Sequence, residues 1–131
     1  MLTTRIFTVS AGIPADISDF IAETVQKNGG SGICTVWVDS DRATLISYSE
    51  DTRMDADLMD DMERAFPARG SYTSAADIEL TGARIRCSVL GFSQSFPVCG
   101  GQVLLGVHQR IHIVSPAESC SVAVSVMMMD S

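Results

Sequence analysis

Three arginines have the type and spacing to bind an anionic ligand. Arg84 and Arg86 are two residues apart, and Arg110 lies in a later segment with a similar alternation of polar and apolar residues. Residues two apart on a β-strand point to the same face of the sheet. We therefore expect Arg84 and Arg86 to share one polar face, where with Arg110 they could hold a phosphate-like anion. The alternative is that the arginines pair with the carboxylates of this acidic chain.

A second candidate group surrounds Gln109. This amide lies between Val107 and Ile111, in an alternating series of residues that is otherwise apolar. It should therefore be hydrogen-bonded, either to a neighbouring loop or to a ligand in a pocket. His108 and His112 would share one strand face about 13 Å apart, which is too far for both to bind one zinc ion. They indicate a solvated or subunit-facing polar surface, or a single histidine that carries a proton.

Five acidic residues that are close in the sequence form a third candidate group. Oxygen-rich clusters suit Mg²⁺ or Ca²⁺, but the spacing here is not that of an EF-hand. We therefore expect neither a metal nor a cofactor, and we retain Asp55 and His108 as candidate catalytic residues. The acidic residues are Asp39, Asp41, Glu50, Asp51 and Asp55.

Two further patterns are better explained by structure than by chemistry. The glycine-rich segment 28–32 follows a predicted helix and precedes a predicted strand, which is the reverse of the order in a phosphate-binding loop. We interpret it as a helix-end turn. The cysteines contain no Cys-x-x-Cys pair, so we expect buried reduced thiols, with a zinc knuckle or a redox pair as the alternative. They are Cys34, Cys87, Cys99 and Cys120.

The elements that would position these residues follow from the apolar periodicity. Helical spacing predicts a helix that begins at Asp16 or Ser18 and ends at Asn28, and a second helix over residues 54–66. Alternating or continuous apolar runs predict strands over residues 3–10, 33–38 and 43–49, the second of them buried on both faces. From Ala83 onward we expect almost only strand. These elements predict a single α+β domain over residues 1–131, with a large, mostly antiparallel, sandwich-like sheet system and two helices.

Composition excludes several classes of function. The 131 residues carry a formal net charge of -7, and Lys27 is the only lysine. This balance is unfavourable for nucleic acid, whose phosphates need clustered lysine and arginine. No apolar stretch approaches the roughly 20 residues that span a membrane, and no signal peptide is visible. We expect a soluble, cytoplasmic protein.

The most specific pattern in the chain covers residues 88–111. It contains Ser-x-x-Gly, then Pro-Val, then Gly-x-Val-x-Leu-Gly-x-x-Gln-x-Ile. This pattern resembles the YjbQ-like family, some members of which are labelled secondary thiamine-phosphate synthases. The helix start Asp16-Ile17-Ser18 and the segment 61–64 are similar to the same family. The resemblance implies an α+β sandwich-like fold and a homotrimer with sites near the subunit boundaries.

The differences from this family are concentrated in its site. Members typically carry three histidines, and the matching positions here are Ser40, Thr73 and Arg84. The family's Trp-Gln is His108-Gln109 in this chain. Three converging histidines would suit a metal, whereas serine and threonine are weak ligands and arginine is a permanent cation. We therefore expect a lost metal site, with the charge of Arg84 near the place of the ion.

Two functions follow from these observations. The first is a non-catalytic homotrimer, which serves a structural role or binds a small, phosphorylated anion through Arg84, Arg86 and Gln109. The second is a transferase of the thiamine-phosphate synthase type, which joins a pyrimidine diphosphate to a thiazole phosphate and displaces pyrophosphate. That reaction needs Mg²⁺ or cationic groups at the leaving phosphate, and Asp55 with the arginines would have to supply them.

Overall fold

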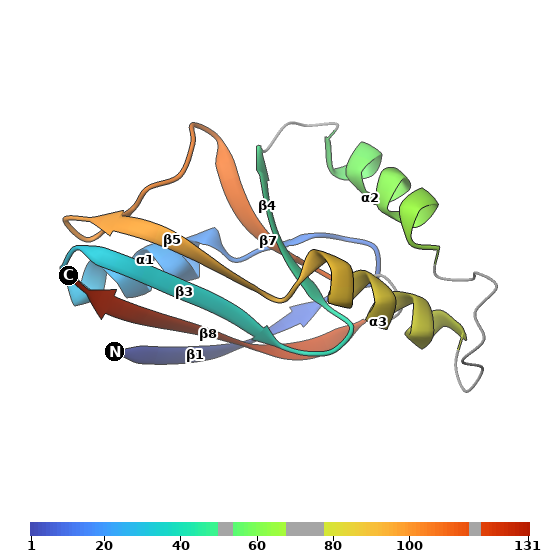
Figure 1. Ribbon diagram of the computed structural model, residues 1–131, viewed down its shortest axis with the longest axis horizontal. Helices are drawn as coiled ribbons and strands as arrows, with labels where there is room; N and C mark the ends of the chain where they lie inside the picture. The colour runs from blue at the N-terminus through green and yellow to red at the C-terminus, as the bar shows by residue number, and fades with distance from the viewer. Residues whose placement is uncertain (50–53, 68–77, 116–118) are drawn as a thin grey trace.

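The computed structural model describes residues 1–49, 54–67, 78–115 and 119–131. Its strands and helices follow one another along the chain as Figure 1 shows. They are β1 Leu2–Val9, β2 Ala15–Asp16, α1 Ser18–Asn28, β3 Gly32–Asp39, β4 Thr44–Ser49, α2 Met54–Ala65, α3 Ile78–Leu90, β5 Ser93–Cys99, β6 Gln102–Val103, β7 Gln109–Val114 and β8 Cys120–Asp130.

The strands form two antiparallel sheets. The larger sheet has the order β1-β8-β3-β5-β6, and the smaller has the order β2-β7-β4. One isolated parallel bridge, between Ala11 and Ser115, joins the segments next to β2 and β7. The core contains side chains from both sheets and from α1, so the α+β, mostly antiparallel fold is as the sequence predicts.

Helix α1 forms because its apolar residues fall on one face. Phe20, Ile21 and Val25 are buried at helical spacing. The helix ends at Gly29, which adopts a left-handed conformation (φ 74°) and donates its N–H to the carbonyl of Val25. Glycine reaches this conformation without steric cost. The glycine-rich segment is therefore a helix-end turn, as predicted.

Residues 83–89 are helical, and the strand predicted for them is wrong. They belong to α3, which is a third helix where the sequence predicted two. Ala83, Arg86 and Cys87 are buried, while Ile85 and Val89 are exposed. Buried positions three and four residues apart mark one face of a helix. The polar–apolar alternation that predicted a strand is also compatible with a short amphipathic helix.

The long strand expected around residues 103–113 is also interrupted. It consists of β6 and β7, which are separated by a loop in which Val107 is exposed and His108 has a φ of 64°. In β3, Cys34, Val36 and Val38 are buried, but Ile33 is exposed. The prediction that this strand is buried on both faces is therefore wrong for the single chain.

The cysteines follow the expectation in part. All four are free thiols, and Cys34 and Cys87 are buried. Cys99 is exposed, because it lies at the end of β5. The helices of the described segments are all too short or too polar to cross a membrane.

Candidate functional site: the Arg84 cleft

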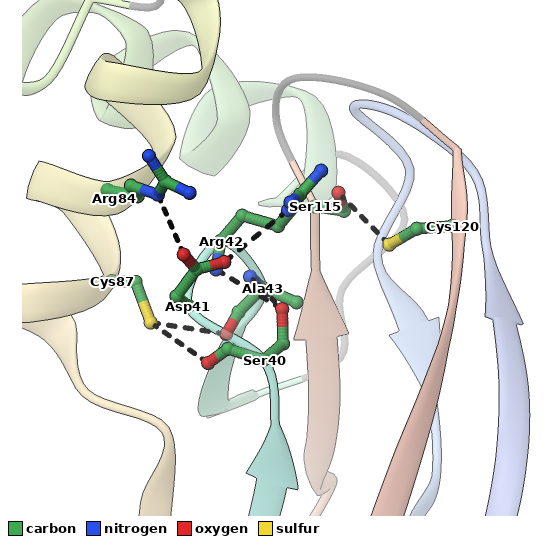
Figure 2. A network of polar contacts seen from close by, with 8 residues as sticks. All are labelled: Ser40, Asp41, Arg42, Ala43, Arg84, Cys87, Ser115 and Cys120. Carbon is green, nitrogen blue, oxygen red and sulfur yellow. Dashed lines mark hydrogen bonds and ion pairs between the residues drawn. The ribbon is translucent and has the colours of Figure 1, made fainter.

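The connection between β3 and β4 is a tight turn organised by Ser40. The Ser40 hydroxyl accepts hydrogen bonds from the backbone N–H groups of Arg42 (3.2 Å) and Ala43 (3.1 Å). Serine stabilises turns in this way because its short side chain reaches the N–H groups two and three residues later. The turn fixes Asp41 at its outer corner, and Figure 2 shows the Asp41 carboxylate pointing toward α3.

Arg84 reaches from α3 to this carboxylate. Its Nε donates to Oδ2 of Asp41 at 2.7 Å, and Arg42 approaches the other carboxylate oxygen at 3.5 Å (Figure 2). The hydrogen bond from Arg84 is the main reason that the pKa of Asp41 lies below its usual value. Asp41 therefore remains ionised at neutral pH and holds the guanidinium in place.

Cys87 fastens α3 to the same turn. Its thiol lies 3.4 Å from the carbonyl oxygen of Ala43 and 3.8 Å from that of Ser40. Burial raises the pKa of Cys87, and the neighbouring Asp41 charge raises it further. Because the thiolate is the reactive form of cysteine, this residue is a packing group and not a nucleophile.

A cleft of about 530 Å³ opens beside the ion pair. The Arg84 side chain is 52% exposed, and its two terminal nitrogens have no hydrogen-bond partner within the described part of the chain. The cleft thus has one oriented cationic group and a partly aromatic wall. Its lining residues are Trp37, Val38, Asp39, Ser40, Asp41, Arg84, Cys87, Ser88 and Phe92.

The residues of this cleft do not suit a metal ion. The Asp41 carboxylate is bound to a guanidinium, the Ser40 hydroxyl is used by its own turn, and the Cys87 thiol is protonated. Across residues 1–49, 54–67, 78–115 and 119–131, no three histidine, cysteine or acidic side chains gather as metal ligands. Ser40 and Arg84 do line one cleft, while Thr73 lies outside the described residues.

Arg86 lies on a different face of α3 from Arg84, so the two arginines do not share a binding surface. Its side chain is 1% exposed and donates to the carbonyl oxygen of Phe66 (2.6 Å) and to Glu63 (3.3 Å). These contacts join α3 to α2. The prediction that Arg84 and Arg86 share a face assumed a strand. On a helix, the side chains of residues two positions apart point in different directions.

Arg110 and Gln109 line another pocket, of about 410 Å³, between α1, β6 and β7. Arg110 donates to Asp16 (2.7 Å) and to Asp19 (3.2 Å), so it does not join Arg84. Burial would raise the pKa of Asp16, but the hydrogen bonds from Arg110 and Ser18 outweigh it and lower the pKa. The arginines thus pair with the chain's own carboxylates, which was the alternative reading of their spacing.

Gln109 is hydrogen-bonded at both ends of its amide, as its position predicted. Its oxygen accepts the N–H of Gly106 (3.0 Å) and its nitrogen donates to the hydroxyl of Ser47 (3.2 Å). These bonds close the loop before β7 and tie it to β4. The structure thus gives Gln109 a bond to a neighbouring loop, while its side chain also lines the pocket beside Arg110.

The two histidines do not form one polar surface. His108 is exposed in the loop before β7, whereas His112 is buried in β7 and stacks on Tyr48, with ring centroids 4.2 Å apart. Tyr48 in turn donates its hydroxyl to Asp55 at 2.6 Å. The acidic group is also dispersed, since Asp41 binds Arg84 and Asp55 binds Tyr48. Glu50 and Asp51 lie outside the described residues.

Sequence reasoning missed the pairing of Arg84 with Asp41, and it did not place Trp37 and Phe92 at a site. A helical reading of residues 83–90 would have supplied the signal. Ala83, Cys87 and Leu90 fall on one helical face, which turns Arg84 away from Arg86.

The fold places the chain among small α+β proteins that have two antiparallel sheets, here with α1 packed against both of them. The chain belongs to the UPF0047, YjbQ-like family, whose model matches residues 6–128. A search of curated proteins gives no match.

Solved structures share this fold at low sequence identity. An uncharacterized conserved protein of the YjbQ/UPF0047 family from Clostridium acetobutylicum has a TM-score of 0.88 and 21% identity, and the match covers 97% of this chain and 99% of that one. A hypothetical protein from Aeropyrum pernix K1 has a TM-score of 0.86 and 22% identity, with 98% and 99% covered. A YbjQ-like protein of unknown function from Sulfolobus solfataricus P2 has a TM-score of 0.81 and 21% identity, with 96% of each chain covered.

Proposed function

We propose that this chain is a non-catalytic YjbQ-like protein that assembles as a homotrimer and binds a small anion at Arg84, in a cleft that has lost its metal site. The observation that carries the proposal is the geometry of the Arg84 guanidinium. Asp41 holds Nε at 2.7 Å, and the two terminal nitrogens have no partner among the described residues. A guanidinium fixed in this way presents two parallel donors, which is the arrangement that binds phosphate or carboxylate.

Two ionisable groups of the cleft are already engaged, which supports a binding role. Cys87 is a protonated thiol, and Asp41 is an ionised carboxylate occupied by Arg84. Neither is available as a nucleophile or as a general base. By the family resemblance, Arg84 matches the position of a family histidine, and its charge would repel a metal cation and attract an anion. The homotrimer rests on the family resemblance.

The test is the melting temperature of the full chain in phosphate, in pyrophosphate and in chloride at matched ionic strength. At a ligand concentration of about ten times Kd, binding adds about 1.4 kcal/mol to the folded state, which raises the melting temperature by about 3–6 °C for a domain of this size. Arg84→Ala should remove this rise. Arg64→Ala is the matched control, because Arg64 is an exposed arginine paired with Asp61 on α2.

Two results would contradict anion binding at Arg84. One is the absence of any rise in melting temperature with every anion tested. The other is a rise that Arg84→Ala leaves unchanged. Elemental mass spectrometry on tag-free protein tests the lost metal site separately, since near-stoichiometric transition metal would mean that the chain has kept a metal site.

The transferase of the thiamine-phosphate synthase type remains a prediction from the sequence. It would need Asp55 and several arginines around one leaving phosphate, whereas Asp55 binds Tyr48, and Arg86 and Arg110 each bind other groups. Rescue of a thiamine auxotroph by this chain, with loss of rescue in Asp55→Ala, would favour the transferase over the binding protein.

A further inference from the structure

Strand β1 forms one edge of the five-stranded sheet. Among the described strands it pairs only with β8, and in Figure 1 it lies along the lower border of the sheet. The carbonyl of Met1 accepts the N–H of Met128 at 3.1 Å. In an antiparallel pair, residues whose backbone groups face the partner alternate with residues whose groups face away. The register of β1 on β8 therefore turns the N–H and C=O groups of four residues toward the free edge, and these are Leu2, Thr4, Ile6 and Thr8.

A groove of about 490 Å³ lies between β1 and α1. The side chains of Thr3 and Arg5 line it from the strand, and Lys27 lines it from the last turn of the helix. The guanidinium of Arg5 lies over the ring of Phe20, 4.7 Å from the ring centroid. A strand added at the free edge of β1 would turn every second side chain toward the α1 side of the sheet, where this groove lies.

The cations of this groove differ from the others that the structure describes. Arg5 and Lys27 have no carboxylate partner within the described part of the chain, although Glu23 also lines the groove. Each of the other described cations forms an ion pair with a carboxylate, and these are Arg42, Arg64, Arg84, Arg86 and Arg110. The chain has 16 acidic residues and 9 basic ones, so an unpaired cation is unusual in it. Both unpaired cations lie beside the free edge of β1.

We propose that the edge of β1 binds an extended acidic segment of a partner protein as an additional strand. The backbone of the segment would pair with the free N–H and C=O groups of β1, and its carboxylates would contact Arg5 and Lys27. The side chains between the carboxylates would lie on the opposite face, beside Leu2 and Ile6, which are 60% and 70% exposed. Apolar residues suit that face because cross-strand neighbours pack together. The segment therefore alternates acidic and apolar residues.

Charge selects this occupant over two others. Pairing of β1 with the same strand of a second copy would bring Arg5 and Lys27 of both copies onto one side of the joined sheet, where like charges repel. Nucleic acid needs a larger cluster of cations than these two. A charge beside an edge strand also discourages pairing with uncharged strands. The cations that attract an acidic segment thus exclude neutral ones.

The test measures the binding of blocked heptapeptides to the full chain by isothermal titration calorimetry at low salt. The probe peptide carries glutamate at its second, fourth and sixth positions, valine at its third and fifth positions, and threonine at both ends. One control peptide has lysine in place of glutamate. Another keeps the glutamates but is N-methylated at its internal residues, which removes the N–H groups that a strand needs. We expect the probe to bind about fivefold or more tightly than either control.

Two variants of the groove test its cations. Lys27→Glu and Arg5→Gln should each weaken binding of the probe by about fivefold. Arg64→Glu is the control for Lys27→Glu, because it makes the same change of charge on α2, at an exposed residue outside the groove. It should leave binding of the probe unchanged. Circular dichroism shows whether each variant is folded, and Arg5→Gln keeps the test valid if Lys27→Glu is not.

Hydrogen exchange measured by mass spectrometry tests the edge itself. The amides of residues 2–8 that face the free edge should exchange rapidly in the free protein and slowly with the probe bound. Slow exchange without the probe would show that another copy already covers the edge, which overturns the inference. It is also overturned by equal binding of the probe and either control peptide, or by no binding at about 1 mM probe. Anion binding at Arg84 is measured separately and is affected by none of these results.

Discussion

At the scale of single residues, burial decides what an arginine of this chain can do. Arg84 and Arg86 are two positions apart on α3, yet one is half exposed beside Asp41 and the other is fully buried between α3 and α2. An exposed ion pair contributes little to stability, because water screens both charges. A buried guanidinium must be hydrogen-bonded, and removing it leaves its partners unsatisfied. The first arginine is therefore free to serve binding, and the second serves the fold.

This contrast gives a prediction for the two alanine variants. Arg86→Ala should lower the free energy of unfolding by about 2–4 kcal/mol, because the carbonyl of Phe66 loses its donor and a cavity remains. Arg84→Ala should lower it by no more than about 1 kcal/mol. Urea denaturation of both variants is the measurement. Equal losses would contradict the assignment of the two side chains to different faces.

At the scale of elements, the sequence was sufficient to predict the strands and helices whose apolar residues recur in a long and regular pattern. Helix α1 was predicted because four apolar residues recur at helical spacing before a glycine turn, and β8 because it alternates over many residues. Helix α3 was assigned to the wrong class. Its short segment of alternating arginine and apolar residues fits both the two-residue period of a strand and the 3.6-residue period of a helix. Only tertiary packing on Ala43 and Phe66 decides between the two.

The same error explains why the candidate site was predicted only in part. The family resemblance gave Ser40 and Arg84 as matching positions, and both line the cleft. Asp41 was assigned to an acidic group because sequence proximity says nothing about a contact 43 residues away. The pairing of Arg84 with Asp41 depends on which face of α3 meets the β3–β4 turn. This face could not be predicted while the segment was assigned to a strand.

The end of α3 offers a prediction at this scale. Gly91 has a φ of 88° and donates its N–H to the carbonyl of Cys87, while a Cβ at this position would meet no neighbouring atom. The cost of a substitution thus comes from the backbone conformation alone. Gly91→Ala should lower the free energy of unfolding by about 1–2 kcal/mol. Gly91→Asn should lower it by less, since asparagine tolerates left-handed conformations better. Chemical denaturation of both variants tests this order.

At the scale of the whole molecule, net charge and exposed apolar side chains have opposite effects on the association of copies of the chain. A net charge of -7 drives copies of the chain apart at long range, whereas exposed apolar side chains such as Ile6 favour contact at short range. Salt screens the first effect, with a Debye length of about 10 Å at 0.1 M. It does not weaken the burial of apolar surface. The assembled state should therefore be favoured by salt, in contrast to complexes held by opposite charges.

The melting temperature of the wild type should rise with protein concentration, because association stabilises the folded state by mass action. At each concentration it should also rise as sodium chloride increases from about 0.02 to 0.5 M, since screening reduces repulsion between copies. Chloride is used because, under the proposed function, phosphate would also bind at Arg84. Screening within one chain raises the melting temperature of a monomer too, so the reference is Ile6→Glu, which places a charge at an apolar side chain of β1 that is 70% exposed. This variant should keep part of the salt response and lose the dependence on protein concentration. A wild-type melting temperature that does not change over about a hundredfold range of concentration would show that folding and association are not coupled.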